Sequence, residues 1–268
     1  MKWSRRGLPN QRLQATRQSG ARLKRNVRAH QRGNVVKRIV VPTRSGSDWQ
    51  PLLAKPKLHW KMGASAMTAA ASWEASGDSL PPEIKERLDS ASDPCLKNLA
   101  LLLARPEWEV PLEGGETTSN TDVLAVCSNK EGLCVVAVEA KVLEDFGPLV
   151  GQKRAEASAG QSARLAYLER VLRAPRFDDS IRYQLVHRTA SALLTAQQFH
   201  AGSAVMIVQA WDAPASRRKD FEAFCLALGS KQCGPLVHQV PGFEHPKLFL
   251  AWCDGNPKFL SVELPSAL

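Results

Sequence analysis

The sequence predicts an α/β domain, a three-layer sandwich in which helices flank a central mixed β-sheet. Two neighbouring runs rich in Val and Leu, 121–126 and 134–141, enclose turn residues and predict a β-hairpin. The run at 204–210, apolar except for Gln209, is typical of a buried, parallel strand. Segments with helical spacing of apolar residues precede and follow these strands, as this fold class requires.

The N-terminal half is expected to be mainly helical. A strand is predicted at 37–41, closed by Pro42. The helices expected after it cover 47–53, 62–74, 81–88 and 96–103. The last of these depends on the helical spacing of Leu96, Leu99, Leu102 and Leu103, and a strand at 108–112 should follow it.

The C-terminal half is expected to alternate helices and strands. Helices are predicted at 161–172, 181–199 and 221–228. Strands are predicted at 204–210, 236–240, 247–252 and 259–262. The long helix should be capped by the segment 178–180. Its polar residues Gln184, His187, Arg188 and Ser191 fall on a different face from its apolar ones.

The formal net charge of +10 is concentrated at the N-terminus. Residues 1–44 hold 13 of the 36 Lys and Arg and no acid, which leaves 23 basic and 26 acidic residues in 45–268. Residues 1–35 have no apolar period and are expected to be disordered, ahead of one domain at 36–268. Three interpretations of this extension compete: an arm that follows phosphates, a transit peptide, or a segment that is not natively translated.

Cysteine spacing and hydropathy exclude several classes. None of the six cysteines forms a C-x-x-C pair, which argues against a structural zinc site, and buried free thiols are expected. The sequence has neither a signal-peptide pattern nor an apolar run of about 18 residues, so a cytoplasmic protein is expected. Nucleotide-binding glycine loops, a serine-hydrolase elbow and the H-E-x-x-H zinc motif are also missing.

Three charged residues in the predicted hairpin indicate a functional site. Glu139 and Lys141 share one face of their strand, and Asp122 begins the neighbouring strand. An ion pair on a solvated sheet face is the simpler interpretation. The unbroken apolar run 135–138 favours a buried strand instead, where charges are costly unless they pair or serve chemistry.

Asp122 followed by Glu139-Ala140-Lys141 resembles the D…(D/E)-x-K signature of the PD-(D/E)XK nuclease superfamily, with Thr121 where that family often has Pro. Three further segments are similar to an uncharacterised bacterial branch of the superfamily, a domain of unknown function: 60–66, 146–148 and 183–191. The resemblance covers roughly residues 37–268 and implies a restriction-endonuclease-like fold.

The resemblance also implies a hydrolase, a magnesium (Mg²⁺) or manganese (Mn²⁺) dependent nuclease acting on nucleic acid, with DNA as the expected substrate. Asp122, Glu139 and the carbonyl of Ala140 would hold the metal, and Lys141 would orient or deprotonate the attacking water. Glu116, in a glycine-rich stretch, is either a third metal ligand or a solvated loop acid.

Substrate contacts are expected from the long helix. Gln184, His187 and Ser191 lie at i, i+3 and i+7 on one face, although His187 could instead bind a carbonyl inside the core. Arg188 is expected to contact phosphate or to pair with Asp179 or Glu169. Two other functions stay open: an inactive domain of this fold that binds nucleic acid or a protein, and an enzyme for a small phosphorylated substrate.

Overall fold

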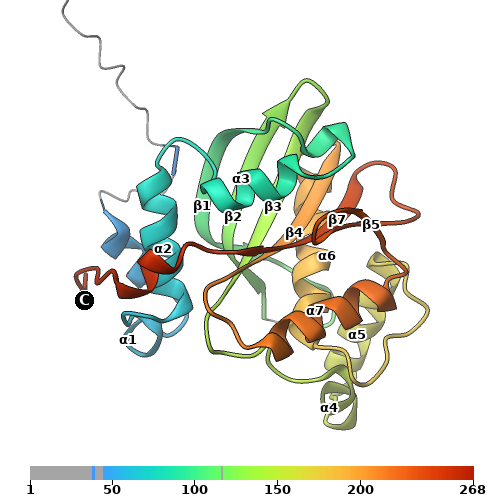
Figure 1. The fold of residues 1–268 in the computed structure, drawn as a ribbon. Helices are drawn as coiled ribbons and strands as arrows, with labels where there is room; N and C mark the ends of the chain where they lie inside the picture. Colours follow the sequence, from blue (N-terminus) through green and yellow to red (C-terminus); the bar gives the residue numbers. More distant parts are fainter. Residues whose placement is uncertain (1–37, 40–44, 116) are drawn as a thin grey trace, which may run out of the picture. The chain divides into compact units, whose positions relative to one another are not determined.

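Seven strands form one mixed sheet in the part of the chain that the structure, a computed structural model, describes: residues 38–39, 45–115 and 117–268 (Figure 1). In spatial order they are β1 (Ala100–Val110), β2 (Ser119–Asn129), β3 (Gly132–Lys141), β4 (Ser203–Ala210), β7 (Lys247–Asp254), β6 (Val237–Val240) and β5 (Lys231–Gly234). Strands β3, β4 and β7 are parallel, and every other neighbouring pair is antiparallel. These residues belong to one compact unit, Val35–Leu268.

Helices cover both faces of this sheet. The helices on one face are α5 (Ala159–Val171), α6 (Tyr183–Gln198) and α7 (Ala215–Ala227), and α4 (Val150–Ala155) precedes α5. The other face is covered by the 3₁₀-helix η1 (Gly46–Leu52), α2 (Ser65–Ser76) and α3 (Pro82–Asp89). Shorter elements are α1 (Pro56–His59), η2 (Pro94–Leu96) and η3 (Pro257–Ser261). The predicted three-layer α/β class is confirmed.

The alternation of side chains along the strands builds two separate hydrophobic cores. On β4, Met206 packs in the core under α5, α6 and α7, whereas Ile207 packs in the core under α2 and α3. Because both faces are covered, every residue of β4 is buried, which explains its continuous apolar run.

Several predicted elements are confirmed. Strands β2 and β3 form the hairpin, and Asn129 pairs with Gly132 across a two-residue turn. Helix α2 ends at Gly77, whose φ of +63° is a conformation that glycine adopts without strain. Helix α3 begins at Pro82, and β4 is parallel to β3 as expected. The six cysteines are free thiols, of which four are buried and Cys95 and Cys233 are partly exposed, and Cys127 lies opposite Cys134 in the hairpin.

The predicted helix at 96–103 is wrong, because the second half of this segment, 100–103, belongs to strand β1. Asn98 takes a left-handed backbone (φ +53°), which stops a helix before it can form. Leu101 is buried while Leu102 is exposed, a period of two that the leucine spacing concealed. Pro106 would break a helix but is tolerated in β1, which lies at the edge of the sheet.

Two further boundaries differ from expectation. The predicted strand at 259–262 is wrong: Asn256 caps the 3₁₀-helix η3 there, and Pro257 opens it. Helix α6 begins at Tyr183 and not at residue 181, because Asp178 binds Ser180 in a turn of its own.

Part of the predicted N-terminal structure lies outside the described residues. Of the strand expected at 37–41, Ile39 forms a parallel bridge with Ala104 of β1, while residues 37 and 40–44 are not described. The extension 1–35 is likewise outside the described residues. Within the described part, no helix has the length and apolar character needed to cross a membrane.

Candidate active site

Asp122, Glu139 and Lys141 lie on one face of the β2–β3 hairpin, at the end away from its turn. Their strand positions place them on the same side as Leu124 and Ala137, which face the core under α6. Asp122 Oδ2 accepts a hydrogen bond from the backbone N–H of Ala140 at 2.7 Å. The structure therefore brings together the three charged residues of the sequence motif.

Glu139 is held by two cations. Lys141 Nζ lies 2.5 Å from Oε1, and Arg188 Nε of helix α6 lies 2.5 Å from Oε2. Glu139 is only 1% exposed and Lys141 only 4%, so the interpretation as a solvated surface pair is wrong. Burial acts to raise the pKa of Glu139, but Arg188 and Lys141 outweigh it and lower that pKa, which keeps the carboxylate ionised.

Arg188 therefore pairs with Glu139 and not with the expected acids. Arg154 takes those two partners: it contacts Glu169 at 2.8 Å and also pairs with Asp179. In forming the Glu139 pair, Arg188 joins α6 to the strand that carries the motif.

Ser119, at the start of β2, links Arg188 to His187. Arg188 Nη1 donates to Ser119 Oγ at 3.1 Å, and the same oxygen is hydrogen-bonded to His187 Nδ1 at 2.8 Å. The expected carbonyl partner of His187 is thus replaced by a hydroxyl. Burial, followed by the charge of Arg188, lowers the pKa of His187 to about 3, so the imidazole is neutral at physiological pH.

Glu107 is a fourth charged residue of the site that sequence reasoning missed. It lies on β1 opposite Asp122, since Pro106 pairs with Val123 and Trp108 with Thr121. Burial, then the charge of Asp122, raises the pKa of Glu107 to about 8. Burial, then the charge of Glu139, raises the pKa of Asp122 to about 7. The φ of Glu107 is +50°, a strained value for a residue with a side chain.

The sequence contains a signal that points to Glu107. A strand is expected at 108–112 next to the site, and the acids Glu107 and Glu109 lie at its start. The mistaken helix at 96–103 hides the register that places Glu107 beside Asp122.

A cavity of about 950 Å³, here the first cavity, opens above these residues. Asp122, Glu139, Ala140, Lys141 and Glu107 line it, as do Gln184, His187 and Arg188 of α6. Further basic residues, Lys55, His59 and Lys153, also line it, as do the acids Glu109, Glu144 and Asp145.

Two predicted site residues are not brought to this cavity. Ser191 is fully buried and donates its hydroxyl to the carbonyl of His187 at 2.7 Å, so its expected place on the substrate face is wrong. The reason is that a serine inside a helix readily bonds the carbonyl four residues earlier. Glu116 lies outside the described residues.

Comparison with known proteins gives one match. Residues 42–257 match the family described as domain of unknown function (DUF6946). The chain belongs to this family. The matched segment contains all the residues that line the first cavity, so the site lies within the DUF6946 domain. No curated protein and no solved structure matches the chain.

The donor atoms of the site fit a hard divalent cation with few protein ligands. Within 38–39, 45–115 and 117–268, no group of three or more His, Cys, Asp or Glu side chains is arranged to hold a metal. Mg²⁺, however, is usually held by one or two carboxylates together with waters and substrate phosphate. Asp122 and Glu107 supply two adjacent carboxylates, whereas both oxygens of Glu139 are already bound to cations.

The backbone of Ala140 offers a third oxygen to this pair. In a strand, the N–H and C=O of one residue point to the same neighbour, so the carbonyl of Ala140 faces the side of Asp122. Burial and the charge of Asp122 raise the pKa of Glu107, and a divalent cation bound by the two carboxylates would offset that repulsion.

Proposed function

We propose that this DUF6946 protein is a magnesium- or manganese-dependent nuclease of restriction-endonuclease-like fold that hydrolyses phosphodiester bonds of nucleic acid. The observation that carries the proposal is the meeting of Asp122, Glu139 and Lys141 on one face of the hairpin, beneath a cavity of about 950 Å³. The mixed sheet with helices on both faces agrees with the fold that the motif implies.

Phosphodiester hydrolysis needs an activated water and positive charge near the phosphate oxygens. Asp122, with Glu107 and the carbonyl of Ala140, would hold the divalent ion, which supplies both when bound. Lys141 is fixed against Glu139 and lines the first cavity, where it would orient the water. Arg188 binds the other oxygen of Glu139 and so holds the Glu139 side chain in place, which in turn fixes the position of Lys141.

The first cavity offers cations to an anionic polymer. Lys55, His59 and Lys153 line it together with the acids Glu109, Glu144 and Asp145, so a bound strand would meet cations interspersed with carboxylates. Gln184 and neutral His187 offer uncharged polar atoms to the substrate. DNA is the substrate we propose, as the nuclease resemblance implies.

One observation favours a second candidate function, an inactive domain of the same fold that binds nucleic acid or a protein. Lys141 and Arg188 satisfy both oxygens of Glu139, as in a purely structural ion-pair network. In that case the residues of the motif would hold β3 to α6 and carry out no chemistry.

The test uses the full chain with labelled single-stranded and duplex DNA and RNA, in Mg²⁺, Mn²⁺ or EDTA. The variants are Asp122→Asn and Lys141→Gln, with Lys130→Gln as a control because Lys130 is an exposed residue in the hairpin turn. We expect cleavage that EDTA abolishes and that each site variant slows by about 10²–10⁴-fold.

Cleavage that persists in both site variants would place the reaction elsewhere and contradict the proposal. Tight binding with no cleavage of any substrate would support the inactive domain. Circular dichroism spectra and unfolding midpoints of the variants, compared with those of the wild type, show whether a loss of activity comes from a loss of structure.

A further inference from the structure

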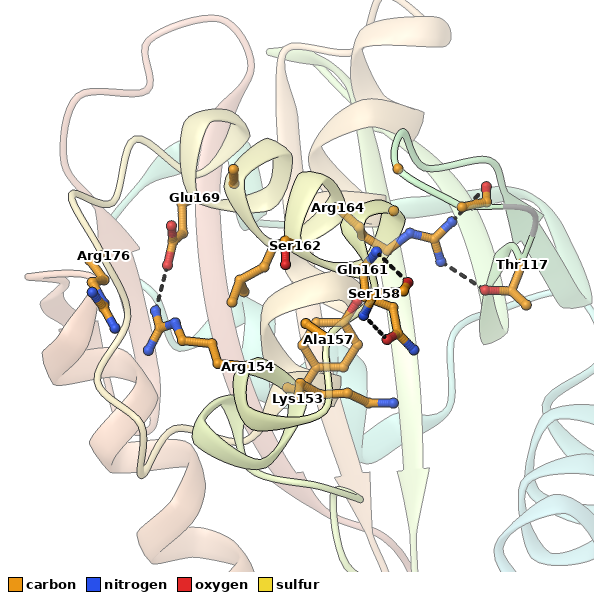
Figure 2. A pocket seen from close by; sticks show the side chains of 16 residues that line it. Thr117, Lys153, Arg154, Ala157, Ser158, Gln161, Ser162, Arg164, Glu169 and Arg176 are labelled. Atoms are coloured by element: carbon orange, nitrogen blue, oxygen red, sulfur yellow. Dashed lines mark hydrogen bonds and ion pairs between the residues drawn. The ribbon is translucent and has the colours of Figure 1, made fainter.

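A second cavity, of about 670 Å³, lies between the loop after β1 and helices α4 and α5 (Figure 2). Its main polar side chains are Thr117, Lys153, Arg154, Arg164, Arg176 and Tyr183. Three of them, Thr117, Lys153 and Tyr183, also line the first cavity. The two cavities are therefore neighbours that share a wall.

Arg164 of α5 brings a buried positive charge to this second cavity. It is 8% exposed and donates to three carbonyls, those of Leu112, Glu113 and Gly115, at 3.0–3.3 Å. It also donates to the hydroxyl of Thr117 at 2.8 Å, as Figure 2 shows. All four acceptors are neutral, and no carboxylate among the described residues lies within 4 Å of the guanidinium. A buried charge of this kind is stabilised by an anion nearby.

Lys153 and Arg176 add two positive charges that have no carboxylate within 4 Å in the described part of the chain. Arg154, by contrast, is neutralised by Glu169 and Asp179. Glu169 is the one acid that lines the second cavity in the described part, against four cations, so this cavity is positively charged overall.

Lys153 lines both cavities and contacts residues of the first one. Its ammonium lies 5.8 Å from the ring centre of Tyr183, and that ring lies 5.1 Å from the ring of His187. His187 is in turn linked through Ser119 to Arg188. A chain of contacts therefore runs from the second cavity to the carboxylates of the first.

The loop after β1 and helix α5 together form one wall of the second cavity. Ser158 and Gln161 form the capping box of α5, and the positive end of that helix faces the cavity. Gly114 packs so tightly that a Cβ there would lie 2.2 Å from the backbone nitrogen of Arg164. The loop and the helix are thus held close together as one wall.

We propose that the second cavity binds a non-scissile phosphate of the nucleic-acid strand whose reacting phosphate occupies the first cavity. This proposal rests on the proposed function, which places the reacting phosphate of the same strand in the first cavity. Lys153 contacts the strand between the two cavities, Arg164 provides the buried counter-charge, and Arg176 extends the positive surface. The uncharged hydroxyl of Thr117 lies at the shared wall.

The experiment measures binding of a labelled single-stranded DNA oligonucleotide to the full chain by fluorescence anisotropy in EDTA, so that no cleavage takes place. The double variant Lys153→Gln/Arg176→Gln removes two cations from the second cavity. The matched control is Lys130→Gln/Lys231→Gln, which removes two exposed cations at the hairpin turn and on edge strand β5.

We expect the cavity variant to bind about tenfold more weakly in about 0.1 M salt. The slope of the logarithm of the binding constant against the logarithm of the salt concentration should become shallower by about 0.7 for each phosphate that the protein no longer neutralises. The control should bind within about twofold of the wild type. Lys153→Arg keeps the charge and should retain most of the affinity of the wild type. Equal affinity of the cavity variant and the wild type would overturn the proposal.

Inorganic phosphate distinguishes a free anion from a strand. If the double variant no longer binds phosphate but binds the oligonucleotide like the wild type, the cavity holds small anions and the strand proposal is overturned. The single variant Arg176→Gln should raise the KM for cleavage more than it lowers kcat, because Arg176 lines the second cavity and not the first.

Failure of this inference is distinguishable from failure of the proposed function. A wild type that binds but does not cleave, together with a weakened cavity variant, would overturn the nuclease and support the second cavity as a nucleic-acid contact. Normal cleavage and normal binding by the cavity variant would leave the nuclease standing and overturn the inference.

Discussion

Arg188 Nε donates to Glu139 Oε2 at 2.5 Å, and this contact ties helix α6 to strand β3 under the first cavity. Both residues are buried, at 9% and 1% exposed. Lys141 occupies the other oxygen of Glu139 at the same distance. Glu139 therefore fixes the position of the proposed catalytic lysine, and Arg188 fixes Glu139.

Replacing Arg188 with Met should destabilise the protein by about 3–5 kcal/mol at pH 7, because it leaves a buried carboxylate with one cation. Because the pKa of Glu139 is lower in the folded than in the unfolded protein, its ionised carboxylate stabilises the folded state at pH values above the unfolded pKa. This stabilisation is lost as the pH falls through the folded pKa. The destabilisation caused by the substitution should therefore shrink below about pH 4. Urea unfolding of the wild type and the variant at pH 7 and pH 3.5 measures the destabilisation and its decrease at low pH. An equal destabilisation at the two pH values would contradict an ionised pair of Arg188 and Glu139.

Replacing Glu107 with Gln should stabilise the metal-free protein at alkaline pH. A carboxyl with a raised pKa costs stability as the pH rises from the unfolded pKa to the folded value of about 8. We expect the variant to be about 1–3 kcal/mol more stable than the wild type at pH 9 in EDTA, after allowance for partial solvent screening. Little difference is expected at pH 4.5. A wild type as stable as the variant at pH 9 would show that burial and the charge of Asp122 do not raise the pKa of Glu107.

Replacing Gly114 with Ala should disrupt the wall of the second cavity. The φ of Gly114 is +85°, and the added Cβ would lie 2.2 Å from the backbone nitrogen of Arg164. We expect the free energy of unfolding in urea to fall by about 2–4 kcal/mol. Gly132→Ala is the matched control, since Gly132 also has a positive φ but faces open space, and its cost should be about 1 kcal/mol. A similar cost for both would mean that the loop moves freely away from α5.

Divalent metal affinity should rise steeply with pH between about 6 and 8. Asp122 and Glu107, with pKa values raised to about 7 and about 8, must release protons before they can hold a cation. His187, with its pKa lowered to about 3, stays neutral over this range and should not contribute. Mn²⁺ titrations at several pH values should show the same pH midpoint for the rise in metal affinity in the wild type and in His187→Asn. A shifted pH midpoint in the variant would assign the pH dependence to the histidine.

The sequence is informative where one pattern has one structural meaning. The apolar runs of β3 and β4, the turn before Gly132 and the prolines that open α3 each predict the observed element. Alternation along β3 also predicts that Glu139 and Lys141 share a face. The position of Asp122 next to them follows from the hairpin pairing.

Local pattern fails where partners distant in the sequence decide the structure. The leucines of 96–103 fit a helix as well as a strand, and pairing of β1 with β2 selects the strand from Ala100 onward. The short strand β5 carries no apolar alternation and exists because it pairs with β6. For the same reason the sequence does not reveal that Arg188 binds Glu139 or that Glu107 lies beside Asp122, since both relationships depend on tertiary packing.

Binding of a hard cation by Asp122 is the most direct test of the account. Isothermal titration of Mn²⁺ into the full chain at pH 8 should give a binding isotherm for the wild type and none for Asp122→Asn. Asp212→Asn, which lies outside both cavities, should bind like the wild type. No binding by the wild type, or equal binding by Asp122→Asn, would contradict a metal site formed by these residues.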